Sequence, residues 1–161
     1  MGSDDSTAIG AESGNDTSSR TEIVIGGAGA DTLSGDDLAN RLEGGGGNDT
    51  LMGGLGSDTF VFNLPTEGMD TITDFSSTED VLEILASGFG GGLTPGGSVT
   101  LLTGADYAAI SGASGFFIYD TDGADAGTVY WDADGGSGAN ATAIARLQGT
   151  PGLSITDFDL V

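Results

Sequence analysis

The sequence predicts an all-β protein, with a short right-handed parallel β-roll followed by an antiparallel β-sandwich cap. Two observations predict this fold. Glycine and aspartate recur with a period of nine between residues 26 and 61, and short apolar runs separated by turn residues continue to the end of the chain. We therefore expect three parts, namely a disordered tail or linker at 1–21, the roll at 22–62 and the cap at 63–161.

The expected tail is rich in Ser, Thr, Gly and Asp and has almost nothing to bury, which is typical of a solvated segment. Residues 1–19 lack the basic and apolar regions of an ordinary signal peptide. The opening Met-Gly-Ser is consistent with a cloning scar, in which case the chain is a piece of a longer protein.

The repeats begin at residue 26. Residues 26–34, 44–52 and 53–61 read GGAGADTLS, GGGGNDTLM and GGLGSDTFV, and all three fit GGxGxDxUx, where U is a large apolar residue. Residues 35–43, GDDLANRLE, keep the frame, with Asn40 in the aspartate position and Leu42 in the apolar position. Residues 17–25 keep only Glu22 and Val24. A Gly-rich linker is the alternative, but three in-frame matches favour a repeat architecture.

A glycine-rich turn and a short strand in every nine residues predict a flattened spiral with two units per coil. Leu33 and Leu51 would then point inward from one sheet, and Val24, Leu42 and Phe60 from the other. Glycine allows the positive φ angles that such turns use. Because five apolar side chains do not offset the entropy of ordering the roll, we expect a further source of stability.

The charge of the chain indicates what that source is. The net charge is −22, with 25 acidic residues against three arginines, Arg20, Arg41 and Arg146. Nucleic acid and anionic lipid are therefore unfavourable partners, and no apolar run approaches the roughly 18 residues of a membrane span. His and Cys are absent, which removes the usual general base and the usual zinc ligands. Carbonyl and carboxylate oxygens favour Ca²⁺, which takes about six to eight of them, over Mg²⁺.

The three nonapeptides resemble the hemolysin-type calcium-binding repeats of the RTX (repeats-in-toxin) family, whose fold is a parallel β-roll. In that family each calcium lies between the turns of units two apart, which implies two pairings here. Residues 26–31 pair with 44–49, and residues 35–40 pair with 53–58. The implied ligands are Gly26, Ala28, Asp31, Gly45, Gly47 and Asp49 in the first pairing, and Gly35, Asp37, Asn40, Gly54, Gly56 and Asp58 in the second.

The second pairing departs from the motif, because Asn40 is neutral and Asp36 and Leu38 replace two glycines. The resemblance also implies that an aspartate of DTITDF closes the last site, which makes Asp70 and Asp74 candidate ligands; a solvated surface role is the alternative. The segment at 132–135, DADG, begins like an EF-hand loop, but Ala143 stands where a bidentate Glu is needed, so a hairpin turn is favoured.

The rest of the chain alternates short apolar runs with Gly, Pro, Asp and Ser, which is typical of short strands. Two Ala-rich stretches, 105–110 and 139–146, are alternative short helices. Tyr107, Tyr119, Tyr130 and Trp131 are expected in the core rather than on a sugar-binding surface. The expected strands are 59–62, 70–75, 81–85, 99–102, 116–119, 128–131, 141–147 and 158–161.

The runs DTFVF, GMDTITDF, EDVLEI, FIYDTDG, VYWDADGGSG, IARLQG and DFDLV resemble, in the same order, the C-terminal domain that comes after RTX repeats in serralysin-type proteases. This resemblance implies a cap on the roll and an uncleaved terminal signal, read by a type I ABC exporter. The acidic and apolar tail at 157–161 matches such a signal. The alternative is a plain edge strand.

We therefore expect a calcium-binding module of a secreted protein, extracellular or at the cell surface, which folds when it meets calcium outside the cell. Its expected partners are calcium ions, the type I secretion machinery and an enzyme or adhesin domain upstream. No HExxH or GxSxG motif occurs, so we do not expect an enzyme. The alternatives are a module of a secreted hydrolase or polysaccharide-modifying enzyme, and a self-assembling surface-layer or adhesin protein.

Overall fold

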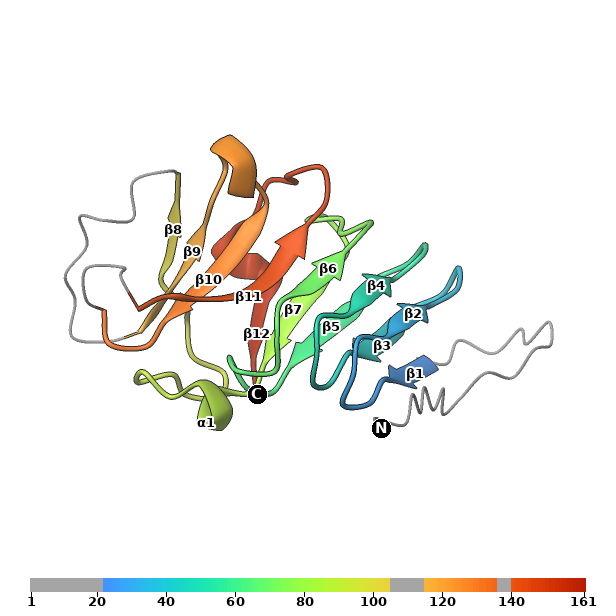
Figure 1. Cartoon of the computed structure of the whole chain (residues 1–161), viewed down its shortest axis with the longest axis horizontal. Helices are drawn as coiled ribbons and strands as arrows, with labels where there is room; N and C mark the ends of the chain where they lie inside the picture. Colours follow the sequence, from blue (N-terminus) through green and yellow to red (C-terminus); the bar gives the residue numbers. More distant parts are fainter. Residues whose placement is uncertain (1–21, 105–114, 136–139) are drawn as a thin grey trace.

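The computed structural model describes residues 22–104, 115–135 and 140–161 and shows a mostly β protein built on a flattened solenoid (Figure 1). One sheet has five strands in the order β1-β3-β5-β7-β12. The other has seven, in the order β2-β4-β6-β11-β10-β9-β8. The two strand orders alternate along the chain up to β7, as expected for a chain that coils around a shared core.

The predicted repeats form the first coils. In the five-stranded sheet β1 (Glu22–Ile25), β3 (Asn40–Glu43) and β5 (Thr59–Phe62) are parallel, and in the other sheet β2 (Thr32–Ser34) is parallel to β4 (Thr50–Met52). The apolar positions pair between coils as predicted, Leu33 with Leu51, Val24 with Leu42 and Leu42 with Phe60. Leu42, Leu51 and Phe60 are fully buried. The β-roll with two units per coil is thus confirmed.

The roll does not stop at Phe62. Strands β6 (Asp70–Ile72) and β7 (Val81–Ile84) continue the parallel sheets, with Ile72 beside Leu51 and Leu82 beside Phe60. Ile72 and Leu82 are also fully buried. The antiparallel arrangement that we expected for these two strands is wrong, because their apolar side chains extend the core of the coils before them.

The last coil comes from the C-terminal part of the chain. Strand β11 (Thr142–Leu147) lies parallel to β6, and β12 (Phe158–Leu160) lies parallel to β7. Figure 1 shows the C-terminus in the middle of the molecule, between β1 at one end and β8 at the other. About four coils are therefore stacked, and the final one is made of residues far from the repeats in sequence.

Antiparallel pairing is confined to a smaller part of the expected cap. Strand β10 (Thr128–Asp132) is antiparallel to β9 (Phe116–Tyr119) and to β11, whereas β8 (Leu101–Thr103) is parallel to β9. The region after the repeats is therefore not a full antiparallel sandwich. Three short helices complete the described elements, α1 (Ala86–Phe89), η2 (Gly123–Asp125) and η3 (Ile155–Asp157).

The alternative helix at 139–146 is wrong, because residues 142–147 form β11 and bury Ile144, Ala145 and Leu147. The alternative helix at 105–110, with Tyr107, and the expected tail at 1–21 lie outside the described residues. Trp131 and Tyr119 are core residues as predicted, and the Tyr119 hydroxyl donates to the Pro151 carbonyl over 2.7 Å. No helix within the described segments has the length and hydropathy to span a membrane.

Candidate metal centre

The turns of the roll fall into two rows, because the chain turns twice in every coil. The first row contains the turns at 26–31, 44–49 and 63–69, which lead from the five-stranded sheet to the seven-stranded sheet. The second row contains the turns at 35–39, 53–58 and 73–80, which lead back. The two pairings implied by the sequence therefore lie on opposite edges of the roll.

Aspartates connect the coils along the first row. The backbone N–H of Asp31 donates to Asp49 Oδ1 over 2.8 Å, and the N–H of Asp49 donates to Asp70 Oδ1 over 3.0 Å. Asp31 Oδ2 accepts from Gly27 N within its own turn, over 2.7 Å. The structure thus brings Asp31 and Asp49 together as expected and adds Asp70 as the next member.

The second carboxylate oxygen of Asp49 has a different environment. Asp49 is only 1% exposed, and its Oδ2 is buried with no hydrogen-bond partner. A Cβ atom at Gly44 would lie 2.3 Å from this oxygen and 3.0 Å from Asp70 Oδ2, so both oxygens face the same glycine. A buried carboxylate oxygen without a partner is unfavourable. A cation between these turns would satisfy it, so the residues fit a bound Ca²⁺.

The backbone of the two turns is stacked closely enough to share an ion. Gly45 and Gly47 have φ angles of +88° and +131°, and a Cβ at Gly45 would lie 2.3 Å from the carbonyl oxygen of Gly27 in the coil before. Only glycine combines this conformation with so close an approach. Carbonyl oxygens of adjacent turns are therefore held near the aspartates.

The second row repeats the pattern with one residue that sequence reasoning missed. The N–H of Asn40 donates to Asp58 Oδ1, and the N–H of Asp58 donates to Asp80 Oδ1, both over 2.9 Å. Asp80 Oδ2 in turn accepts from Ser76 N over 2.8 Å. Asp80 is 22 residues after Asp58 instead of 18, so a nine-residue period does not predict it as the next member of the row. The signal that remained is the triplet of aspartate, any residue and a large apolar residue, since Asp80 precedes Val81 and Leu82.

Asp74 contacts the backbone of the turn at 53–58. Its carboxylate is exposed, but it accepts from the N–H groups of Gly53 and Gly54 over 3.0 and 2.9 Å. It therefore fixes the turn at 53–58 from the following coil. Asp70, the other candidate from the same segment, is buried.

Burial raises the pKa of several of these carboxyl groups. The pKa of Asp70 is raised from 3.8 to about 7, first by desolvation and then by the negative charge of Asp49. The pKa values of Asp58 and Asp80 are raised as well, mainly by desolvation. A buried carboxyl group that resists ionisation, as those of Asp58, Asp70 and Asp80 do, keeps its proton, and a divalent cation would displace that proton.

The remaining candidate ligands form the turn backbone. A Cβ at Gly26 or Gly35 would lie 2.3 Å from the carbonyl oxygen of Gly44 or Gly53, so these turns also touch those of the next coil. Gly54 and Gly56 have positive φ angles of +102° and +113°, whereas Ala28 and Asp37 are exposed at the tips. No group of three or more His, Cys, Asp or Glu side chains converges anywhere in the described segments. An ion would therefore depend on turn carbonyls together with one or two carboxylates.

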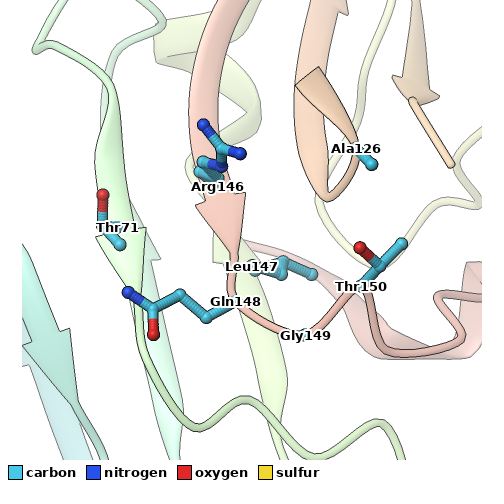
Figure 2. A pocket seen from close by; sticks show the side chains of 7 residues that line it. All are labelled: Thr71, Ala126, Arg146, Leu147, Gln148, Gly149 and Thr150. Carbon is cyan, nitrogen blue, oxygen red and sulfur yellow. The ribbon is translucent and has the colours of Figure 1, made fainter. Parts of the chain in front are cut away.

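Two other features lie apart from these rows. Asp132 Oδ1 accepts from the N–H groups of Asp134 and Gly135, and Ala143, which stands where an EF-hand needs a bidentate Glu, lies in β11 opposite Tyr130. A hollow of about 630 Å³ opens beside β11 and is lined by Thr71, Ala126, Arg146, Leu147, Gln148, Gly149 and Thr150. Figure 2 shows Thr71 and Gln148 on one side of β11 and Ala126 and Thr150 on the other.

Parallel coils, glycine turns and rows of buried aspartates define a calcium-type β-roll, and a family comparison agrees. Residues 16–37 and 25–60 match the RTX calcium-binding nonapeptide repeat, in four copies. The chain therefore contains RTX calcium-binding repeats folded as a β-roll. Modules of this kind are typically found in secreted proteins, and Ca²⁺ is the structural ligand of their repeats.

Among solved structures, the chain is similar to the AlgE6R3 subunit of the mannuronan C5-epimerase from Azotobacter vinelandii, determined in solution. The sequence identity is 29%, the TM-score is 0.52, and the match covers 86% of this chain and 72% of that subunit. No curated protein sequence matches the chain. The serralysin-type cap and the type I secretion signal stay predictions.

Proposed function

We propose that this chain is a non-catalytic module of a secreted protein whose roll folds around calcium ions outside the cell. The observation that carries the proposal is the buried and unpartnered Oδ2 of Asp49, beside Asp70 and between stacked glycine turns. Without a cation, burial opposes the charge on the Asp70 carboxylate. With Ca²⁺, the same oxygens would tie one coil to the next.

Such an arrangement links folding to binding, because the ligands of one ion come from turns that only the folded roll brings together. The chain would stay unfolded in the repeat region at low calcium and fold at the higher concentration outside the cell. A calcium titration monitored by far-UV circular dichroism tests this, with Mg²⁺ as the comparison ion. Full β signal in EDTA, with no change in melting temperature on adding Ca²⁺, would refute it.

A second candidate function is supported by the similarity to AlgE6R3, a subunit of an enzyme named for its action on mannuronan. We propose that the module accompanies a domain that modifies an acidic polysaccharide. The candidate binding site for such a polysaccharide is the hollow beside β11. Arg146 and Gln148 line it, and Arg146 is one of three basic residues in a chain of net charge −22. Calorimetric titration with mannuronan in calcium, on the chain and on its Arg146→Ala variant, tests it. Equal heats from both, or none, would count against this location.

A further inference from the structure

The turn at 35–40 differs chemically from the turn at 44–49. The side-chain Nδ2 of Asn40 donates to Asp36 Oδ1 over 3.1 Å and to the carbonyl oxygen of Leu38 over 2.5 Å. Asp36 Oδ1 also accepts from the backbone N–H of Leu38, over 2.8 Å. Asp36 Oδ1 and the carbonyl oxygen of Leu38 therefore already accept hydrogen bonds from inside the turn.

The contrast with Asp49 is direct, since both residues stand at the sixth position of their repeats and both are 1% exposed. Asn40 presents two N–H donors to its turn, whereas Asp49 presents a carboxylate oxygen that has no partner. Asn40 Oδ1 is buried and unpartnered too, but a neutral amide oxygen attracts a divalent cation less than a carboxylate does.

The backbone of the turn at 35–40 accepts side chains at two glycine positions of the motif. Thr150 is the one non-glycine residue with positive φ in the segments that the structure describes, so Asp36 and Leu38 do not use the left-handed region. Gly45 and Gly47, at the same positions of the next unit, do use it, but Gly29 in the turn at 26–31 does not. The turn at 35–40 is therefore distinguished by its side chains and not by its backbone conformation.

We propose that Asn40 takes the place of a calcium ion in its turn, so that the pairing of 35–40 with 53–58 is formed without metal. This inference rests on the proposed calcium-binding function. The bond from Asn40 N to Asp58 Oδ1 keeps the two coils together as in the other row. The roll therefore binds calcium unevenly. Ions bind between the turns of the first row and after the turn at 53–58 in the second row, whereas the side-chain amide of Asn40 stabilises the outermost second-row turn.

The test uses two reciprocal substitutions, Asn40→Asp and Asp49→Asn, each compared with the unchanged chain by a direct count of bound Ca²⁺. Asn40→Asp should gain one ion per chain and show a larger rise in melting temperature between low and saturating calcium. Asp49→Asn should lose one ion. An unchanged count for Asn40→Asp would overturn the inference about Asn40, whereas an unchanged chain that binds no ions would overturn the proposed function itself.

A second measurement does not depend on the variant folding. The side-chain NH₂ resonances of Asn40 in the unchanged chain can be tracked by NMR from the lowest calcium at which the roll is formed up to saturation. Because the two hydrogen bonds donated by the Asn40 side chain should persist, its NH₂ resonances should keep their chemical shifts, while the resonances of residues in the first row should change theirs. A shift as large as that of the first row would mean that an ion binds at Asn40, and the inference would be wrong.

Discussion

Replacing Asp49 by Ala removes the carboxylate that links two coils of the first row. In EDTA the substitution has two opposing effects on the free energy of unfolding. The N–H of Asp31 loses its acceptor, which costs about 1–3 kcal/mol, but a buried charge beside Asp70 is also removed. In calcium the loss of a ligand is added. At free calcium 100-fold above the dissociation constant a filled site contributes about 2.7 kcal/mol. At about 2–4 °C per kcal/mol, losing it lowers the melting temperature by about 5–11 °C.

Scanning calorimetry of Asp49→Ala and Asp37→Ala, each in EDTA and in calcium, checks this value. Asp37 is exposed at the tip of its turn, so its replacement should change stability by no more than about 0.5 kcal/mol. The calcium-dependent part of the shift should therefore be confined to Asp49→Ala. Equal shifts in both variants would refute the reasoning, because they would mean that overall negative charge, and not the stacked turns, binds the metal.

Three further predictions concern chelation, pH and the C-terminal strand. Chelation with EDTA should remove much of the far-UV β signal and Ca²⁺ should restore it while Mg²⁺ does not; a signal lost only in part would mean that the C-terminal strands fold without the repeats. The pKa of Asp70, raised from 3.8 to about 7, means that the folded state holds a proton that the unfolded state releases. In the part of the roll that stays folded in EDTA, the contribution of Asp70 to stability is full below about pH 4 and is lost as the pH rises through about 7. Melting curves against pH should show this decline, Asp70→Asn should flatten it, and an identical decline in that variant would contradict the assignment. Deleting residues 158–161 removes β12 and its pairing with β7, so the melting temperature in calcium should fall. The exposed Asp159→Ala change should leave it nearly constant. Export of the truncated chain by a type I system should fall too, and normal export would refute the predicted signal.

The repeats were predictable because each nonapeptide contains both the glycines of its turn and the apolar residue that its strand buries. Leu33 and Leu51 stand eighteen residues apart in matching units, and they pair in adjacent strands. Asp80 was not found, because the turn before it is longer than the motif and has no glycine. Its bond to the N–H of Asp58 depends on how that longer turn folds back, which local sequence does not specify.

The strands after the repeats were located well, but their partners were not. Residues 142–147 read as a strand or a short helix from composition, and nothing nearby indicates that Leu147 would lie beside Ile72. Short strands joined by turns usually form antiparallel hairpins, which is correct for β9 and β10. Parallel pairing over such a separation depends on which apolar surface the last coil leaves uncovered. That is a property of the whole core.

The closure of the roll by β11 and β12 depends on strands that all come after the repeats. Duplicating one nonapeptide between β4 and β5 would move β5 and every later strand together to the opposite sheet, so β6 would still lie beside β11 and β7 beside β12. Only the pairs of β3 with β5 and of β4 with β6, which lie on either side of the insertion, would be replaced. New units placed before β1 would keep even these pairs, because in the described part of the chain β1 pairs only with β3 and β2 only with β4. The array of repeats can therefore change in length while the strands that close the roll stay paired.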